Sequence, residues 1–328
     1  NMQTAVIDAT DYNTAAYFDF ESNTTVTATD DWDIGFIRDK IIVNSGKKTA
    51  IADIQAEYYQ ADGVTPSNSG QSFANATPST ELSSLLNATT IIGEWVDSGV
   101  KSAIDGDWNI PGHPLQATDQ FYIIRSAEGN SYAKITSNAF TFTGRAYEVV
   151  FDTYVQGSGD NAFSSTVEQI TVTSGTDSCY DFESSTFVDC AAANWDIKFA
   201  WSERSLPIYT NGGVSGDGDA AVYKIADTET EADYPHGDFR HADQSGVFSA
   251  AWVQDVEASI FADYSWYAYD PLNDGMHQLY SNYRVYVIDT DAADISNTPY
   301  KMQVTGYYNE SGSSAHYSIR FTALSDTE

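Results

Sequence analysis

The side chains best suited to chemistry are five histidines, because a neutral imidazole can ligate a metal or haem iron and exchange a proton near neutral pH. Four of them lie in the second half of the chain: His236, His241, His277 and His316. His113 is the fifth, and it precedes a strand-like segment by the same distance as His277 does. His113 and His277 therefore occupy equivalent positions in the two halves of the chain. They could be ligands, or they could be loop residues without a function.

His236 and His241 have an odd spacing, which places them on opposite faces of a straight strand. They are not expected to bind one metal together, but either could meet His277 across a pocket. Two imidazoles on opposite sides of an iron porphyrin would make a six-coordinate haem site. Five aromatic residues could pack on such a ring, or could be ordinary core and edge residues of a β-sheet: Phe239, Tyr264, Trp266, Tyr267 and Tyr269.

Motifs that would specify an enzyme do not occur in the sequence. It contains no nucleophile elbow, zinc-protease helix, phosphate-binding loop, covalent haem-attachment motif or EF-hand. Two acidic pairs, Asp30-Asp31 and Asp217-Gly218-Asp219, could bind Ca²⁺ loosely but are typical of solvated turns. We therefore expect a binding protein and not an enzyme.

The charge balance excludes other classes of partner. The 47 acidic residues outnumber the 15 basic ones and give a net charge of −32, so nucleic acid and anionic lipid would be repelled. No apolar run is long enough to cross a membrane as a helix, and the first residues lack the pattern of a signal peptide. We expect a mature, soluble chain whose abundant Tyr, Thr, Ser and Asn favour an extracytoplasmic β-protein.

The only two cysteines, Cys179 and Cys190, flank a stretch typical of a hairpin. If that hairpin forms, the thiols face each other near its open end, where a cross-strand disulfide is geometrically easy. A disulfide would indicate an oxidising compartment, whereas two reduced, half-buried cysteines would suit a cytosolic protein. The secreted character of the composition favours the disulfide.

The second half of the chain repeats motifs of the first half in the same order. The clearest matches are Asp19-Phe20-Glu21-Ser22 with Asp181-Phe182-Glu183-Ser184, Trp32-Asp33-Ile34 with Trp195-Asp196-Ile197, and Tyr147–Phe151 with Tyr317–Phe321. Ordered matches of this kind indicate a duplicated domain. We expect a first domain at 1–156 and a second at 157–328, joined by a flexible Gly-Ser-Gly segment.

The dominant period within each copy is two, which predicts antiparallel strands. In Trp32–Phe36 the Trp, Ile and Phe share one face and Asp33 points the other way, as in a strand with one face in the core. The only stretch expected to be helical is Ser79–Leu86. The sequence therefore predicts an all-β chain of two tandem homologous antiparallel β domains with little helix.

These motifs resemble the HmuY family of bacterial haem-binding proteins. The resemblance rests on Ala5–Phe20 followed by Trp32-Asp33-Ile34, on Phe121–Arg125 and Ala133–Ile135, and on Tyr147–Tyr154, and it returns from about Ile170 to Leu324. It implies a haemophore that is secreted or held on the outer-membrane surface, for example as a lipoprotein. Such a protein takes non-covalent haem b from host or environmental haemoproteins and passes it to an outer-membrane transporter.

The same resemblance implies two axial side chains on the iron, one of them in a loop after a Trp. His277 matches that place in the second copy and His113 in the first. The other ligand comes from the central region, where His241 is preferred because His236 directly follows a proline. Met276, beside His277, is an alternate ligand.

Two further expectations and one alternative follow. Because a ligating imidazole must be neutral, haem binding should weaken below about pH 6.5. Arg240, Arg284 or Lys224 would offset the charge of the haem propionates. The alternative is a glycan-binding or adhesion β-module without haem, whose exposed aromatic side chains stack on sugar rings.

Overall fold

The chain folds into two compact units, which are not the two expected domains. The computed structural model describes residues 2–61, 65–66, 70–104, 108–110, 116–118, 120–143, 146–201, 206–223, 225, 230, 232, 234 and 252–326. Unit 1 consists of Asn1–Gly99 with Glu257–Glu328, and unit 2 is Val100–Val256. The boundary expected between residues 156 and 157 lies inside unit 2, because strands near the two chain ends pair with each other.

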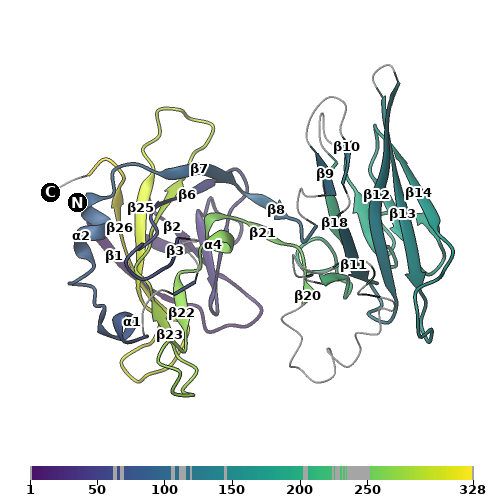
Figure 1. Cartoon of the computed structure of the whole chain (residues 1–328). Helices are drawn as coiled ribbons and strands as arrows, with labels where there is room; N and C mark the ends of the chain where they lie inside the picture. Colours follow the sequence, from purple (N-terminus) through teal and green to yellow (C-terminus); the bar gives the residue numbers. More distant parts are fainter. Residues whose placement is uncertain are drawn as a thin grey trace. The chain divides into compact units, whose positions relative to one another are not determined.

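Unit 1 contains a six-stranded and a four-stranded antiparallel sheet. The larger sheet has the order β1-β26-β25-β24-β6-β7 and the smaller β3-β2-β4-β5. The strands are β1 (Gln3–Asp8), β2 (Ala16–Asp19), β3 (Thr24–Val26), β4 (Ile34–Ile37), β5 (Lys40–Val43), β6 (Lys48–Asp53), β7 (Ile92–Asp97), β24 (Val285–Asp289), β25 (Tyr300–Gly306) and β26 (His316–Ala323). In Figure 1 the purple start of the chain and its yellow end lie side by side in the larger sheet.

Unit 2 contains the same two kinds of sheet. Their orders are β14-β13-β12-β11-β19-β20 and β16-β15-β17-β18, again antiparallel. The strands are β11 (Phe121–Arg125), β12 (Tyr132–Thr143), β13 (Ala146–Gln156), β14 (Glu168–Thr173), β15 (Ser178–Asp181), β16 (Thr186–Val188), β17 (Ile197–Phe199), β18 (Ile208–Thr210), β19 (Ala221–Tyr223) and β20 (Trp252–Val253).

Short elements complete the described part of the chain. Three strand pairs are β8 (Gly99–Lys101) with β21 (Val256–Ala258), β9 (Asn109–Ile110) with β10 (Gln116–Ala117), and β22 (Tyr267–Tyr269) with β23 (Leu279–Ser281). The helices are α1 (Gln71–Asn75), α2 (Leu82–Asn87) and α4 (Ile260–Asp263). The helix expected at 79–86 is thus confirmed in part, since it begins three residues later and has no side-chain cap. The all-β prediction is confirmed.

Each unit encloses its own aromatic core, as the period-two pattern predicts. In unit 1, Phe18, Phe20 and Phe321 pack edge to face with ring centroids 4.9–5.7 Å apart. In unit 2, Phe151 packs on Phe199 at 5.1 Å. The inward residues of the paired sheets make these contacts, so the sheets of each unit share one core.

The disulfide is confirmed. Cys179 lies on β15 and Cys190 just after β16, and they are bonded with their Cα atoms 5.2 Å apart. Among the described residues, no helix has the length and apolar character needed to cross a bilayer.

Candidate functional site

A groove in unit 1 contains the one described histidine of the expected haem site. We call it the His277 groove; its volume is about 600 Å³ and it is lined by Tyr12, Ile37, Arg38, Asp39, Lys40, His277, Leu279, Tyr307, Tyr308 and Ser314. Most of these residues lie in or beside three turns, which join β4 to β5, β22 to β23, and β25 to β26. Tyr12 lies in the segment that follows β1. Turns at strand ends are a common place for binding residues because the sheets beneath hold them rigidly.

His277 is held across the β22–β23 hairpin by a tyrosine. The hydroxyl of Tyr269, on β22, lies 2.6 Å from Nδ1 of His277, and the two rings stack with centroids 5.9 Å apart. The His277 backbone has φ = +54°, a conformation that is uncommon for non-glycine residues and concentrates at functional sites. With Nδ1 engaged, Nε2 of the exposed imidazole is the nitrogen available to a ligand.

Two of the predicted aromatic residues support the groove from beneath. Trp266 is 2% exposed and donates its indole N–H to the backbone carbonyl of Asp39 at 2.8 Å. Tyr267 donates its hydroxyl to the Asp39 carboxylate at 3.1 Å. These residues therefore fix the β4–β5 turn and, apart from this support, do not line the groove.

Tyr264, another of the predicted aromatic residues, lies beside a buried arginine. The guanidinium of Arg284 lies 5.2 Å from the ring centre of Tyr264 and 4.1 Å from that of Tyr59. Arg284 is 2% exposed and lines a second cavity of about 420 Å³ instead of the His277 groove. Its interactions are therefore those of a core residue, and it is poorly placed to meet propionates at the surface.

The cations of the groove are Arg38 and Lys40, which the sequence reasoning missed. Arg38 lies 4.4 Å over the ring of Tyr12 and donates to the carbonyl of Thr10 and the hydroxyl of Ser314. These contacts hold its guanidinium at the groove wall. The only sequence signal was an Arg-Asp-Lys turn between two apolar strands, which is common on any surface.

The remaining predicted residues divide into exposed and undescribed ones. Met276 is 65% exposed and does not line the groove. His316 is half-buried on β26, with Nδ1 3.0 Å from the carbonyl of Ser314, which agrees with its interpretation as a sheet-face residue. Several predictions lie outside the described residues: His113, His236, His241, Phe239, Lys224 and Arg240.

Electrostatics disfavour two phenols as iron ligands, that of Tyr307 in the groove and that of Tyr267 beneath it. Burial, followed by the nearby Asp39 carboxylate, raises the pKa of Tyr307 to about 12. The same two causes raise the pKa of Tyr267 to about 12. Both phenols are therefore protonated at neutral pH, and forming a phenolate ligand from either would cost free energy.

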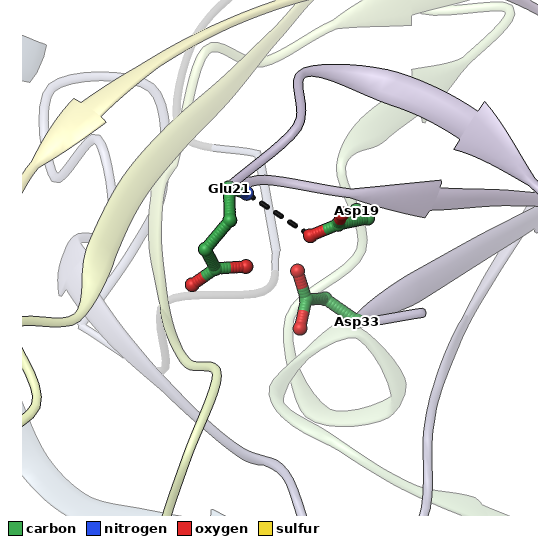
Figure 2. Close-up of side chains that lie close together, drawn as sticks. All are labelled: Asp19, Glu21 and Asp33. Atoms are coloured by element: carbon green, nitrogen blue, oxygen red, sulfur yellow. Dashed lines mark hydrogen bonds between the residues drawn. The ribbon is translucent and has the colours of Figure 1, made fainter. Parts of the chain in front are cut away.

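The repeated Asp-Phe-Glu and Trp-Asp motifs have a different, structural role. Figure 2 shows Asp19, Glu21 and Asp33 together in unit 1, with the Glu21 N–H donating to Asp19 at 3.0 Å. Asp33 is 1% exposed instead of facing solvent, and it accepts the N–H of Phe20 at 2.8 Å. Lys47 Nζ lies 3.3 Å from the Asp33 carboxylate and 2.8 Å from that of Asp31. The motif thus closes the turn after β2.

Unit 2 repeats this turn without the lysine. Asp196 is fully buried and accepts the N–H groups of Phe182 and Ala127 at 2.7 and 2.6 Å. Burial raises the pKa of Asp196 to about 8, and of Asp33 to about 7. In each unit three carboxylates approach within 4.8 Å, but their hydrogen bonds account for the motif as a turn lock.

The described residues fit a haem group in three respects. Nε2 of His277 is available as an axial ligand, aromatic side chains offer ring faces, and Arg38 with Lys40 can neutralise carboxylates.

A model of the HmuY protein family matches residues 11–152. Over those residues the chain is similar to HmuY proteins. The HmuY match includes Tyr12 and the Arg38–Lys40 turn of the groove, whereas His277 lies beyond it.

Two solved structures are similar to this chain at low sequence identity. A solved structure described as an HmuY-like heme-binding protein from Bacteroides vulgatus ATCC 8482 has 11% identity and a TM-score of 0.34, covering 100% of this chain and 93% of that one. A structure described as a lipoprotein from Bacteroides fragilis NCTC 9343 has 10% identity and a TM-score of 0.35, covering 100% and 92%. No curated protein matches the chain.

Proposed function

We propose that this chain is an extracytoplasmic haem-binding protein whose His277 groove holds non-covalent haem b. The observation that carries the proposal is the pairing of an HmuY match with a groove that presents an oriented imidazole beside two cations. When bound, haem would supply an iron that accepts axial nitrogen ligands.

His277 acts as one axial ligand in this proposal. If its Nδ1 donates to the Tyr269 oxygen, Nε2 carries the lone pair needed for ligation. A hydrogen bond at the second ring nitrogen fixes the tautomer and the orientation of a ligating histidine. His241, from the central region, remains the proposed second ligand, with His236 and Met276 as alternates.

Arg38 and Lys40 bind the propionates. The chain carries a net charge of −32, so an anionic ligand approaches against long-range repulsion and requires local cations. Arg38 is held in place by Tyr12 and Ser314, so little side-chain freedom is lost when it pairs with a carboxylate.

We further propose a haemophore role at the cell surface or outside the cell, with transfer to an outer-membrane transporter. The Cys179–Cys190 disulfide supports an oxidising compartment. The exposed position of His277 supports transfer, since a ligand at a surface groove can be reached by a partner.

The test is a titration of the purified chain with haemin, followed in the Soret band, for the wild type, His277→Ala, His241→Ala and His316→Ala. We expect saturable binding by the wild type and a loss of affinity of at least tenfold in His277→Ala. His316→Ala serves as the matched control, since it removes a histidine whose ring contacts backbone carbonyls, and it should bind as the wild type does.

Binding that is unchanged in His277→Ala would contradict the ligand assignment. The absence of any spectral change in the wild type would contradict haem binding and favour the glycan-binding or adhesion module.

A further inference from the structure

The two units have the same topology, strand for strand. Position by position, β1-β26-β25-β24-β6-β7 in unit 1 corresponds to β14-β13-β12-β11-β19-β20 in unit 2. The smaller sheets correspond in the same way, β3-β2-β4-β5 to β16-β15-β17-β18. One register shift of the larger sheets recurs at the equivalent strand pair: between Val304 and Gly306 on β25, opposite β26, and between Ser137 and Ala139 on β12, opposite β13. This shared bulge aligns Val150 with Ser318, two residues away from the sequence match of Tyr147–Phe151 with Tyr317–Phe321.

In each unit, however, the strands come from both sequence repeats. Unit 1 takes β1 to β7 from the first repeat and β24 to β26 from the second. Unit 2 takes β11 to β13 from the first repeat and β14 to β20 from the second. Each six-stranded sheet thus joins an amino-terminal half of one repeat to a carboxy-terminal half of the other.

The chain changes unit at the same place in both repeats. Val96 on β7 opposes Thr49, and Val253 on β20 opposes Val222, each following a tryptophan. A few residues later come β8 and β21, which carry the chain from one unit to the other. Crossings at equivalent positions of the two repeats are expected when two copies exchange identical elements.

Hydrogen bonds at the repeated turn cross between repeats. Thr290, from the second repeat, donates its hydroxyl to Glu21 of the first at 2.7 Å. In unit 2 the donor comes from the first repeat and the acceptor from the second, because the hydroxyl of Ser131 donates to the carboxylate of Glu183. The family match also indicates that one repeat contributes to two units, since residues 11–152 span one repeat but belong to both units.

We propose that the chain is a tandem duplication in which the two copies have exchanged their carboxy-terminal halves, so that neither copy folds without the other. The His277 groove is then composite: Tyr12, Arg38 and Lys40 come from the first copy, and His277, Tyr307 and Tyr308 from the second. This proposal does not depend on haem binding.

Cysteine pairs in the full chain distinguish the two arrangements. Val6 is 77% exposed and lies opposite Ser318 of β26, the first pair beyond the bulge. Without exchange, β13 would lie beside β1, and Val150 would take the place of Ser318, because Val150 is the first residue beyond the equivalent bulge. Directly opposed residues are close enough for oxidation or a short bismaleimide.

We expect an intramolecular crosslink in Val6→Cys/Ser318→Cys and none in the matched Val6→Cys/Val150→Cys variant. The reverse pattern would overturn the proposal, as would a crosslink in Val6→Cys/Ser318→Cys that forms only between molecules.

Cleavage of the full chain gives an independent test. The turn after β13 is exposed at Ser158 and Gly159, so a protease site inserted there can be cut in the folded protein. Both cysteines lie in the second fragment, so the disulfide does not join the pieces. If the halves are exchanged, the fragments co-elute at the size of the intact chain on native gel filtration. Separation into two folded fragments would overturn the proposal.

Discussion

The hydroxyl of Tyr269 lies 2.6 Å from Nδ1 of His277, across a hairpin whose connecting loop places His277 at positive φ. Two rings that stack and hydrogen bond in this way restrict the imidazole to one orientation. The pair is therefore built to present Nε2 to the His277 groove.

Replacing Tyr269 with phenylalanine should weaken haem binding without abolishing it. Loss of a partner at the second ring nitrogen typically lowers metal affinity by about 10–100-fold. A haemin titration of Tyr269→Phe measures this change. Tyr280→Phe is the control, since the Tyr280 hydroxyl donates to Gln278 instead, and equal losses in both variants would contradict the role of Tyr269.

Replacing Arg38 with glutamine should lower haem affinity several-fold, because one carboxylate loses a charge-assisted partner. The same variant should bind haem dimethyl ester as the wild type does, since that molecule has no propionate charge. Lys48→Gln is the control, because Lys48 pairs with Asp97 and does not line the groove. An equal loss for haem and its ester would contradict a propionate contact.

Replacing Asp196 with asparagine should flatten the pH dependence of stability. Burial raises the pKa of Asp196 to about 8, from 3.8, so the folded state holds a proton that the unfolded state releases. The stabilisation is complete below about pH 4 and is lost as the pH rises to about 8, with a slope of up to about 1.4 kcal/mol per pH unit. Denaturant unfolding from pH 4 to 8 measures this slope.

The control for this prediction is Glu310→Gln, which removes the same charge from an exposed position. We expect its pH dependence to follow the wild type. A wild-type slope that persists in Asp196→Asn would contradict this prediction. It would show that other charged groups determine how the free energy of unfolding depends on pH. Asp196→Asn should also lose roughly 1–3 kcal/mol at low pH, because an amide cannot accept both N–H groups.

Removing the disulfide should destabilise unit 2 locally. A crosslink closing a short loop contributes roughly 2–4 kcal/mol, mainly through the unfolded state. In Cys179→Ala/Cys190→Ala we expect faster amide hydrogen exchange in β15 to β18 and unchanged haem affinity, since neither cysteine lines the His277 groove. Equal losses of protection in the β1–β26 sheet would contradict this.

Local pattern was sufficient to predict the strands and the disulfide. Alternation of apolar residues identified segments such as β11 and β26, because strand burial repeats every two residues. The hairpin around Cys179 and Cys190 brought two thiols together through pairing of neighbouring segments. Both predictions depend on contacts between residues close in sequence.

Predictions that depended on distant contacts failed. Nothing in the sequence reveals that β1 pairs with β26 instead of β13, since both candidate partners carry the same repeat pattern. Trp266 supports the Asp39 turn, which is the core-residue alternative to packing on a haem ring, and Asp33 was expected to face away from the core but is buried by Phe20 and Lys47. In each case the partner lies far away along the chain.

The most direct test of the account is the electron paramagnetic resonance spectrum of the ferric haem complex. The wild type should give the low-spin signal of a six-coordinate site, and His277→Ala should lose it. Imidazole added to His277→Ala should restore the signal by occupying the vacant axial position. A low-spin signal that is the same in His277→Ala as in the wild type would contradict the claim that His277 ligates the iron.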